Sequence, residues 1–221
     1  VVGRMLLEVL VFRSLFRNTK TEKQGEALGV GSAKWLWLGA LVFHWSMLII
    51  VLRHLRFFLE PVPGAIVALE GADAFFQIGL PALYLTDLLI VSALTILFIP
   101  RVRYLSLPND FFPLFLLLGV VIAGIAMRYF FRVDIEGVKE VAMGLVTLHP
   151  VVIAGIGSIF YVHLFLASVL IGYFPWSKLM HAGGIVLSPT RNQANDSRAV
   201  RHVNPWNPDL PVHTYAEYED E

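Results

Sequence analysis

The 221-residue chain contains no cysteine. It therefore forms no disulfide, no thiolate-ligated iron–sulfur cluster and no covalently attached c-type haem, and any redox centre must use nitrogen or oxygen ligands. Charge is also scarce, since 15% of the residues are charged against about a quarter in average soluble domains. Lys+Arg 17 equals Asp+Glu 17, so bulk charge does not indicate a nucleic-acid partner.

Hydrophobic residues are in excess, at 57% of the chain with a mean hydropathy of +0.67. A bilayer core of about 30 Å requires roughly 20 apolar residues in a helix. Four stretches meet this requirement, at about residues 35–59, 74–99, 111–131 and 148–174. The sequence therefore predicts an all-α, polytopic membrane helix bundle with four transmembrane helices in the lipid bilayer.

The polar residues divide the chain into three parts. Residues 1–34 are expected to form an interfacial helix, too short to cross a membrane, followed by a basic segment. Residues 35–175 form the transmembrane bundle, and residues 176–221 form an extended tail rich in Pro, Asn and charge. Most lysines and arginines fall on the side of the basic segment and the tail, so these parts are expected to be cytoplasmic. The first residue is Val1, which predicts that the natural N-terminus lies upstream.

Four of the seven histidines lie in or at the ends of two predicted spans. His44 and His54 are ten residues apart in the first span, and His163 and His181 are eighteen apart in and just after the fourth. Eighteen residues make five full helical turns, so His163 and His181 are expected on one face of a helix. An ionisable residue inside a membrane helix is costly, which makes each of these histidines a candidate functional residue.

The antiparallel arrangement of the first and fourth spans pairs these histidines. His44 is expected opposite His181 near the cytoplasm, and His54 opposite His163 near the outer surface. Ten residues rise about 15 Å and eighteen about 27 Å, so the two pairs become level only if the helices tilt or the last one kinks; Pro175 is the candidate kink. Two imidazoles facing each other, twice over, could hold two haems by both axial positions.

Two alternatives remain open for the histidines. Each histidine, taken alone, fits a hydrogen-bonded structural group. Together, they could serve as proton relays in a proton-coupled membrane transporter or channel. That function would predict broken helices and inverted repeats, and the sequence shows neither.

Three arginines and one further histidine are candidates for binding the rest of a haem or a quinone. Arg53, Arg56 and Arg128 lie near the outer ends of spans, where a planar guanidinium suits an anionic haem propionate, or where the side chain simply reaches the interface. His149 is expected at the start of the fourth helix, where it could contact a quinone head group or cap the helix.

Several motifs resemble a known family. The runs FHWSMLIIVLRH and YVHLFLASVLIGYFPWSKLMH resemble the cytochrome b subunit, or gamma subunit, of respiratory nitrate reductase. That family shares the two histidine spacings and the ending that runs from Phe174 to His181. The segments VVGRMLLEVLVFRSLFRNTK, VLRHLRFFLEPVP, GLVTLHP and RHVNPWN look like the DsrM subfamily, the membrane cytochromes of the Dsr electron-transfer complex.

The resemblance implies a function in sulfur respiration. It implies two b-type haems, with His44, His54, His163 and His181 as axial ligands, and exchange of electrons with menaquinol or menaquinone near the outer haem. It also implies a cytoplasmic iron–sulfur partner similar to the catalytic subunit of heterodisulfide reductase, with other membrane and extracytoplasmic subunits in one complex. A further membrane segment upstream is expected, with the chain in the inner or plasma membrane and its C-terminus in the cytoplasm.

Overall fold

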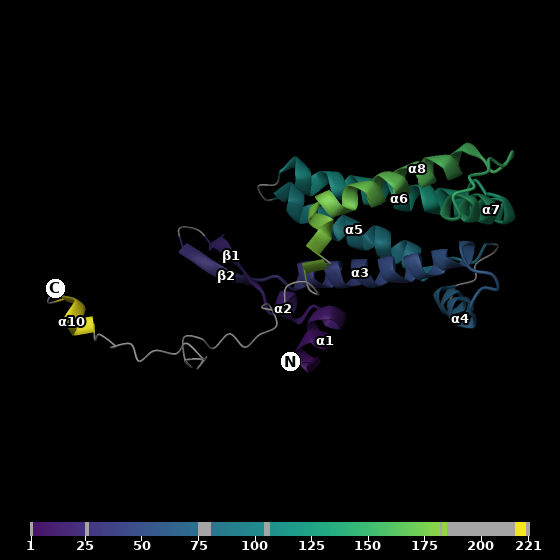
Figure 1. The fold of residues 1–221 in the computed structure, drawn as a ribbon. Coiled ribbons are helices and arrows are strands. Elements are labelled where there is room, and N and C mark those ends of the chain that lie inside the picture. Colours follow the sequence, from purple (N-terminus) through teal and green to yellow (C-terminus); the bar gives the residue numbers. More distant parts are fainter. Residues whose placement is uncertain are drawn as a thin grey trace.

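The computed structural model describes residues 2–24, 27–74, 81–103, 107–181, 183–184 and 215–219. Its helices and strands are shown in Figure 1 and follow in chain order: α1 (Val2–Val11), α2 (Arg13–Phe16), β1 (Thr19–Gln24), β2 (Ala27–Ser32), α3 (Lys34–His54), η1 (Leu55–Phe57), α4 (Gly64–Asp73), α5 (Leu85–Arg103), α6 (Pro108–Tyr129), α7 (Ile135–Val146), α8 (Ser158–Tyr173), η2 (Phe174–Trp176), η3 (Lys178–Met180) and α10 (Tyr215–Glu219).

Four long helices form the bundle, each antiparallel to the next along the chain (Figure 1). α3 packs along α5, α5 along α6, and α6 along α8, whereas α3 and α8 have no extended backbone contact with each other. α4 and α7 lie at one end of the bundle, and α1, α2 and the strands lie at the other. The first and last long helices are thus the two whose side chains meet without close backbone packing.

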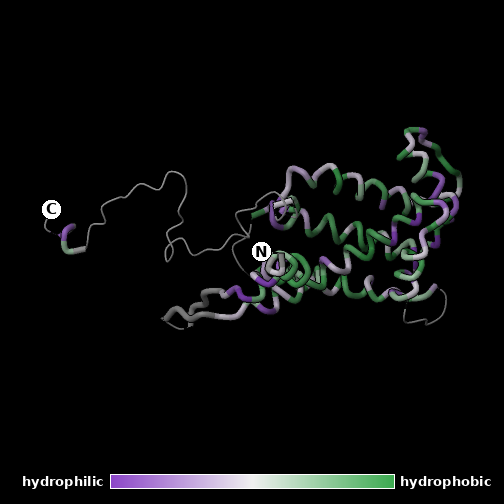
Figure 2. Tube along the Cα trace, turned by 60° about the horizontal axis from the view of Figure 1, so that its bottom comes forward, coloured by the Kyte–Doolittle hydropathy of each residue, from purple (hydrophilic) through white to green (hydrophobic). Residues whose placement is uncertain are grey.

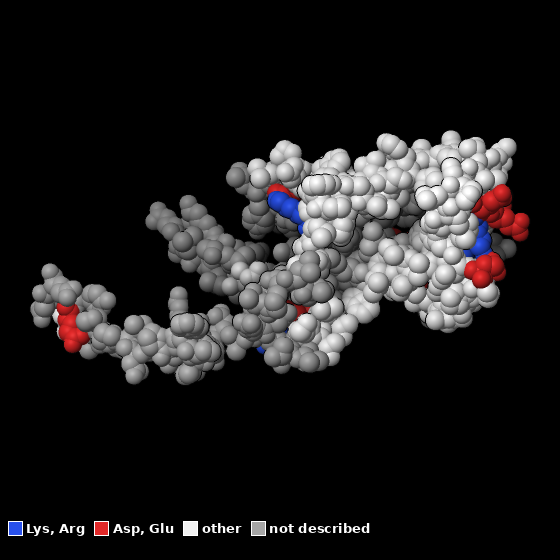
Figure 3. Space-filling view, in the orientation of Figure 1, with Lys and Arg blue, Asp and Glu red and all other residues white. Residues whose placement is uncertain are grey.

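Three helices are long and apolar enough to cross a membrane: Lys34–Phe57, Pro108–Tyr129 and Ser158–Trp176. The apolar part of α5, Leu85–Pro100, is shorter. Hydrophobic residues run along the bundle helices in Figure 2, and in Figure 3 the charged side chains in view gather at the two ends of the bundle. The described helices thus confirm three of the four predicted spans as helices of sufficient length.

Two predicted span boundaries were wrong. The second span was expected to begin near residue 74, but α4 ends at Asp73 and α5 begins at Leu85, with residues 75–80 outside the described part. The fourth span was expected from residue 148, but α8 begins at Ser158. Gly155 and Gly157 have φ values of 88° and 98°, which a helix does not allow. Hydropathy alone did not predict that the chain leaves the helical conformation before α5 and before α8.

The described chain is mostly helical, as predicted, but it is not entirely α-helical, because residues 19–32 contain an antiparallel pair of strands. Thr19 pairs with Ser32, and Gln24 pairs with Ala27. Thr19, Thr21 and Val30 favour strands, and Gly29 and Gly31 disfavour a helix. The expected N-terminal helix is present as α1, while almost all of the C-terminal tail lies outside the described residues.

The α3–α5 contact depends on a glycine. A Cβ atom added to Gly39 would lie 2.8 Å from Cγ2 and 3.4 Å from Cβ of Ile96. These distances are below normal van der Waals separation, and a small residue is a common way for membrane helices to approach closely. A separate buried cluster lies between α5 and α6 and consists of Ile90, Leu94 and Leu117.

Replacing Gly39 with leucine should push α3 away from α5. We expect a loss of about 1–3 kcal/mol, the usual cost of overpacking, measured as a lower midpoint of thermal unfolding in detergent. The matched control is Gly172→Leu in α8, where an added Cβ meets no atom within 4 Å. Equal midpoints for the two variants would contradict the assigned packing.

Candidate functional site

His44 and His181 face each other at the end of the bundle that carries α1 and the strands. Their Nε2 atoms are 3.4 Å apart, and their ring planes are nearly perpendicular, at 87°, with 5.6 Å between centroids. His44 comes from α3, and His181 follows η3. The structure therefore brings together the two histidines that the sequence paired.

His54 and His163 face each other toward the α4–α7 end. Their ring centroids are 6.2 Å apart, and the ring planes are close to parallel, at 14°. His163 comes from α8 and lies beside α6, where a Cβ atom on Gly124 would lie 3.4 Å from its Cε1. The absence of a side chain at Gly124 leaves room for this imidazole.

All four histidines bind a backbone carbonyl through Nδ1. The partners are Ala40 O at 2.7 Å for His44, Ile50 O at 2.7 Å for His54, Val120 O at 3.0 Å for His163 and Lys178 O at 2.9 Å for His181. A carbonyl only accepts, so Nδ1 of each imidazole donates this bond, and in the neutral ring the lone pair is then on Nε2. This is the arrangement by which proteins orient a histidine for a metal ion.

The route by which the chain reaches His181 differs from the prediction. The expected continuous helical face from His163 to His181 was wrong, because α8 ends at Tyr173 and two 3₁₀ turns follow. Pro175 lies in the first turn, where its ring and missing N–H end the α-helix. The Ser177 side chain accepts a hydrogen bond from Leu179 N at 3.1 Å and so caps the second turn. These turns replace the continuation of α8, and after them His181 lies opposite His44.

An ion pair joins this turn to α6. Lys178 Nζ binds Asp110 Oδ1, and Asp110 also accepts a hydrogen bond from Leu107 N at 3.0 Å at the start of α6. The carbonyl that orients His181 belongs to Lys178 itself. The cross-helix pair therefore fixes the residue that orients the imidazole.

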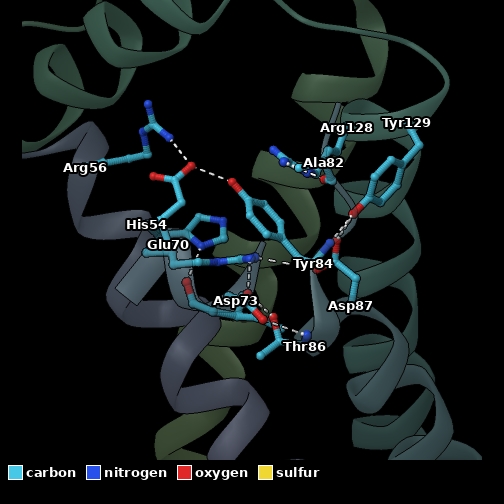
Figure 4. A network of polar contacts seen from close by, with 12 residues as sticks. His54, Arg56, Glu70, Asp73, Ala82, Tyr84, Thr86, Asp87, Arg128 and Tyr129 are labelled. Atoms are coloured by element: carbon cyan, nitrogen blue, oxygen red, sulfur yellow. Dashed lines mark hydrogen bonds and ion pairs between the residues drawn. The ribbon is translucent and has the colours of Figure 1, made fainter. Parts of the chain in front are cut away.

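A buried polar network lies beside His54 (Figure 4). Arg53 binds Asp73 through Nη1, and its Nη2 lies 3.6 Å from Asp87 Oδ1. The Arg53 and Asp73 side chains are only 10% and 4% exposed. Asp73 also accepts hydrogen bonds from Thr86 N at 2.9 Å and Thr86 Oγ1 at 2.6 Å. These contacts compensate a buried charge that would otherwise be costly.

Tyr84 lies at the centre of this network. Its hydroxyl donates to Glu70 Oε1, which also binds Arg56 Nη1. Its ring contacts the guanidinium carbons of Arg53 and Arg128, at 3.7 Å and 3.5 Å from the centroid. Burial, and next the bond to Glu70, raise the pKa of Tyr84 to about 12. At neutral pH the phenol therefore keeps its proton, and its O–H donates a hydrogen bond to the carboxylate.

Arg128 differs from the other two candidate arginines. Its Nη2 donates to Ala82 O at 2.9 Å, but its Nε is buried without a hydrogen-bond partner. Within the described part of the chain it forms no ion pair, whereas Arg53 and Arg56 each bind a carboxylate. Arg128 lies four residues after Gly124, on the face of α6 that contacts His163.

His149 does not lie where the sequence suggested. It was expected at the start of the fourth helix, but it belongs to the loop between α7 and α8, where its Nδ1 is 2.8 Å from Thr147 O. Gly155 and Gly157, with positive φ, separate His149 from α8, which begins at Ser158. Of the remaining histidines, His202 and His213 lie outside the described residues.

The carboxylates and tyrosines of the network were not among the predicted site residues. One signal was available in the sequence: Glu70 and Asp73 are three residues apart, as are Arg53 and Arg56, so each pair lies on one helical face. The matching intervals allow two ion pairs between successive helices.

The described residues contain no group of three or more His, Asp or Glu that could hold a metal ion, so a metal here would depend on the two-histidine pairs.

The chain is similar to known proteins over most of its length. Two curated relatives match 95% of the chain, and both are named Hdr-like menaquinol oxidoreductase cytochrome b-like subunit. The relative from Archaeoglobus fulgidus is 50% identical over 220 residues, and the one from Archaeoglobus profundus is 40% identical over 220 residues. The chain spans 66% and 65% of their respective lengths. No solved structure matches the chain.

The family comparison covers most of the molecule. The model of the nitrate reductase gamma subunit family matches residues 4–192, which include all four paired histidines and every bundle helix. Together with the apolar helices, the match indicates an integral membrane protein. The chain belongs to the nitrate reductase gamma subunit family.

Proposed function

We propose that this chain is a membrane cytochrome b subunit that carries electrons between menaquinol and a partner subunit through two b-type haems. The observation that carries the proposal is the pair of cross-bundle histidine contacts, His44 with His181 and His54 with His163. The relatives' names, cytochrome b-like subunit of a menaquinol oxidoreductase, support it.

The histidine pairs fit an iron porphyrin held from both sides. The Nε2 atoms of His44 and His181 are 3.4 Å apart, slightly less than two metal–imidazole bonds of roughly 2 Å each. In this pair the two Nε2 atoms face each other between α3 and the turns that follow α8, the two long helices without close backbone contact. The bound haems would supply one-electron chemistry, and the protein residues would orient the ligands and exclude water.

Arg128 is the best candidate for a propionate of the haem between His54 and His163. Its buried Nε lacks a partner, and a charged donor without an acceptor is unfavourable inside a protein. A carboxylate of the cofactor would compensate it with a charge-assisted hydrogen bond. Arg53 and Arg56 remain candidates, but Asp73 and Glu70 already bind their charges.

Quinol exchange is proposed at the α4–α7 end, near His54. Oxidation of a quinol releases two electrons and two protons, so groups that accept protons must lie nearby. Glu70 is partly exposed and accepts a hydrogen bond from Tyr84, which suits it to pass protons to solvent. His149, in the neighbouring loop, is the second candidate for contact with the quinone head group.

The opposite end is proposed to face the cytoplasm and the electron-transfer partner. Arg13, Arg17, Lys34 and Lys178 lie at this end, as expected for the cytoplasmic side. The partner would be an iron–sulfur subunit similar to the catalytic subunit of heterodisulfide reductase, in a complex of the Dsr type that serves sulfur respiration. These 221 residues contain no cysteine, so they offer no thiolate ligand for an iron–sulfur cluster.

Replacing His163 with alanine should remove one of the two haems. The variant loses one axial ligand, so the reduced-minus-oxidised spectrum of the purified protein should show the low-spin b-type absorption of a single haem per chain. His149→Ala is the matched control and should keep both. Unchanged haem content in the His163 variant, or a colourless protein before any substitution, would refute the proposal.

Replacing Arg128 with glutamine should affect only the haem between His54 and His163. Loss of a charge-assisted hydrogen bond of about 1.5–3 kcal/mol should weaken retention of that haem, and loss of the positive charge should lower its midpoint potential. Redox titration of the b-type absorption measures both effects. Arg56→Gln, which removes a guanidinium already bound to Glu70, should have a much smaller effect; equal shifts would exclude a special role for Arg128.

A further inference from the structure

The junction between α1 and α2 lies against His44. The Phe12 ring is edge-on to the imidazole, with 5.0 Å between centroids and 84° between planes. On the same imidazole, the Phe43 ring makes a second edge contact at 5.0 Å and 87°. His44 is therefore held by two aromatic rings, of which Phe43 belongs to its own helix and Phe12 belongs to the N-terminal segment.

The backbone at Phe12 adopts an unfavourable conformation. Its φ and ψ values are 51° and 49°, in the left-handed helical region. Of the residues that the structure describes, Leu148 is the only other non-glycine residue with positive φ. Large side chains rarely adopt this conformation, and it persists only where surrounding contacts impose it.

The two residues before Phe12 are held in place by hydrogen bonds from α3. The indole N–H of Trp45 donates to Leu10 O at 3.0 Å, and that of Trp37 donates to Val11 O at 2.7 Å. Both tryptophans belong to α3, the helix that carries His44. These two bonds bind the last carbonyls of α1 to the helix whose histidine the Phe12 ring contacts.

A carboxylate completes the turn. Glu8 in α1 accepts hydrogen bonds from Ser14 N at 2.9 Å and Ser14 Oγ at 2.7 Å. These bonds join α1 to α2 across Phe12. The turn is therefore bound to α3 by two indoles and closed on itself by Glu8, with the Phe12 ring directed toward His44.

We propose that Phe12 is a positioning residue that holds the His44 imidazole in its orientation and excludes water from the α1 side of the His44–His181 pair. This inference rests on the proposed haem between these histidines. The oxidised haem carries one more positive charge than the reduced haem, and water stabilises the more charged state. Excluding water therefore raises the reduction potential of this haem.

The test is a redox titration of the b-type absorption of membrane-embedded protein carrying Phe12→Ala. One of the two haem transitions should move to a lower potential, and the other should stay in place. The matched control is Phe16→Ala, because Phe16 belongs to the same segment but packs on Trp37; it should leave both transitions unchanged. Phe12→Leu should restore most of the wild-type potential, since leucine also excludes water.

Two further variants separate the effect of the ring from that of the backbone. Phe12→Gly removes the ring and also relieves the strain, since glycine adopts positive φ readily. It should show the same lowered potential as the alanine variant, and its thermal stability should equal or exceed that of the alanine variant. The double variant W37F/W45F keeps the Phe12 ring but removes both indole donors, and it should lower the same potential by less.

Each outcome decides between the two proposals. If either the Phe12→Ala or the Phe12→Gly variant holds two haems with unchanged potentials, the proposed role of Phe12 is overturned. If neither single variant accumulates in membranes, unchanged potentials in W37F/W45F would overturn it equally. Absence of b-type haem from the unsubstituted protein would instead refute the proposed function.

Discussion

The hydrogen bond from an imidazole Nδ1 to a backbone carbonyl is the interaction on which the candidate site depends. It occurs at all four paired histidines. Two of the carbonyls belong to α3, each one turn before its histidine, one belongs to α6, and one belongs to η3. Each bond satisfies one polar atom of a ring that an apolar environment would otherwise penalise. It also leaves the second nitrogen free toward the opposite helix. A single kind of contact therefore accounts for both the tolerance of histidine in apolar helices and its orientation.

The charges near His54 obey a related constraint. Arg53 stays buried because Asp73 and Asp87 compensate it, and Asp73 in turn is satisfied by Thr86. Such a network adds little net stability, but it is strongly disrupted when one member is lost. It joins α3, α4 and the start of α5, so it fixes the end of the bundle around one histidine pair. Arg128, which lacks an ion pair among the described residues, is the exception within this otherwise balanced group.

The sequence predicted the bundle and the histidine pairs because both follow from patterns with few alternatives. Long apolar runs must become helices in a membrane, and antiparallel spans place His44 opposite His181. The route between His163 and His181 was predicted in part: Pro175 was the candidate kink, but the two 3₁₀ turns that replace the helix there were not expected. The break before α8 was missed, since hydropathy does not register the positive φ of Gly155 and Gly157. The Phe12 contact depends on tertiary hydrogen bonds, which leave no periodic signal.

The two histidine pairs differ in the angle between their ring planes, 87° for His44 with His181 and 14° for His54 with His163. The magnetic anisotropy of low-spin ferric iron depends on whether its two axial imidazoles are crossed or aligned, because their orientation splits the iron d orbitals. In the proposed haem sites, two irons with chemically identical ligands would thus have distinct electron paramagnetic resonance spectra. The crossed pair would give the more axial g-tensor, so each end of the bundle could be followed separately in one sample.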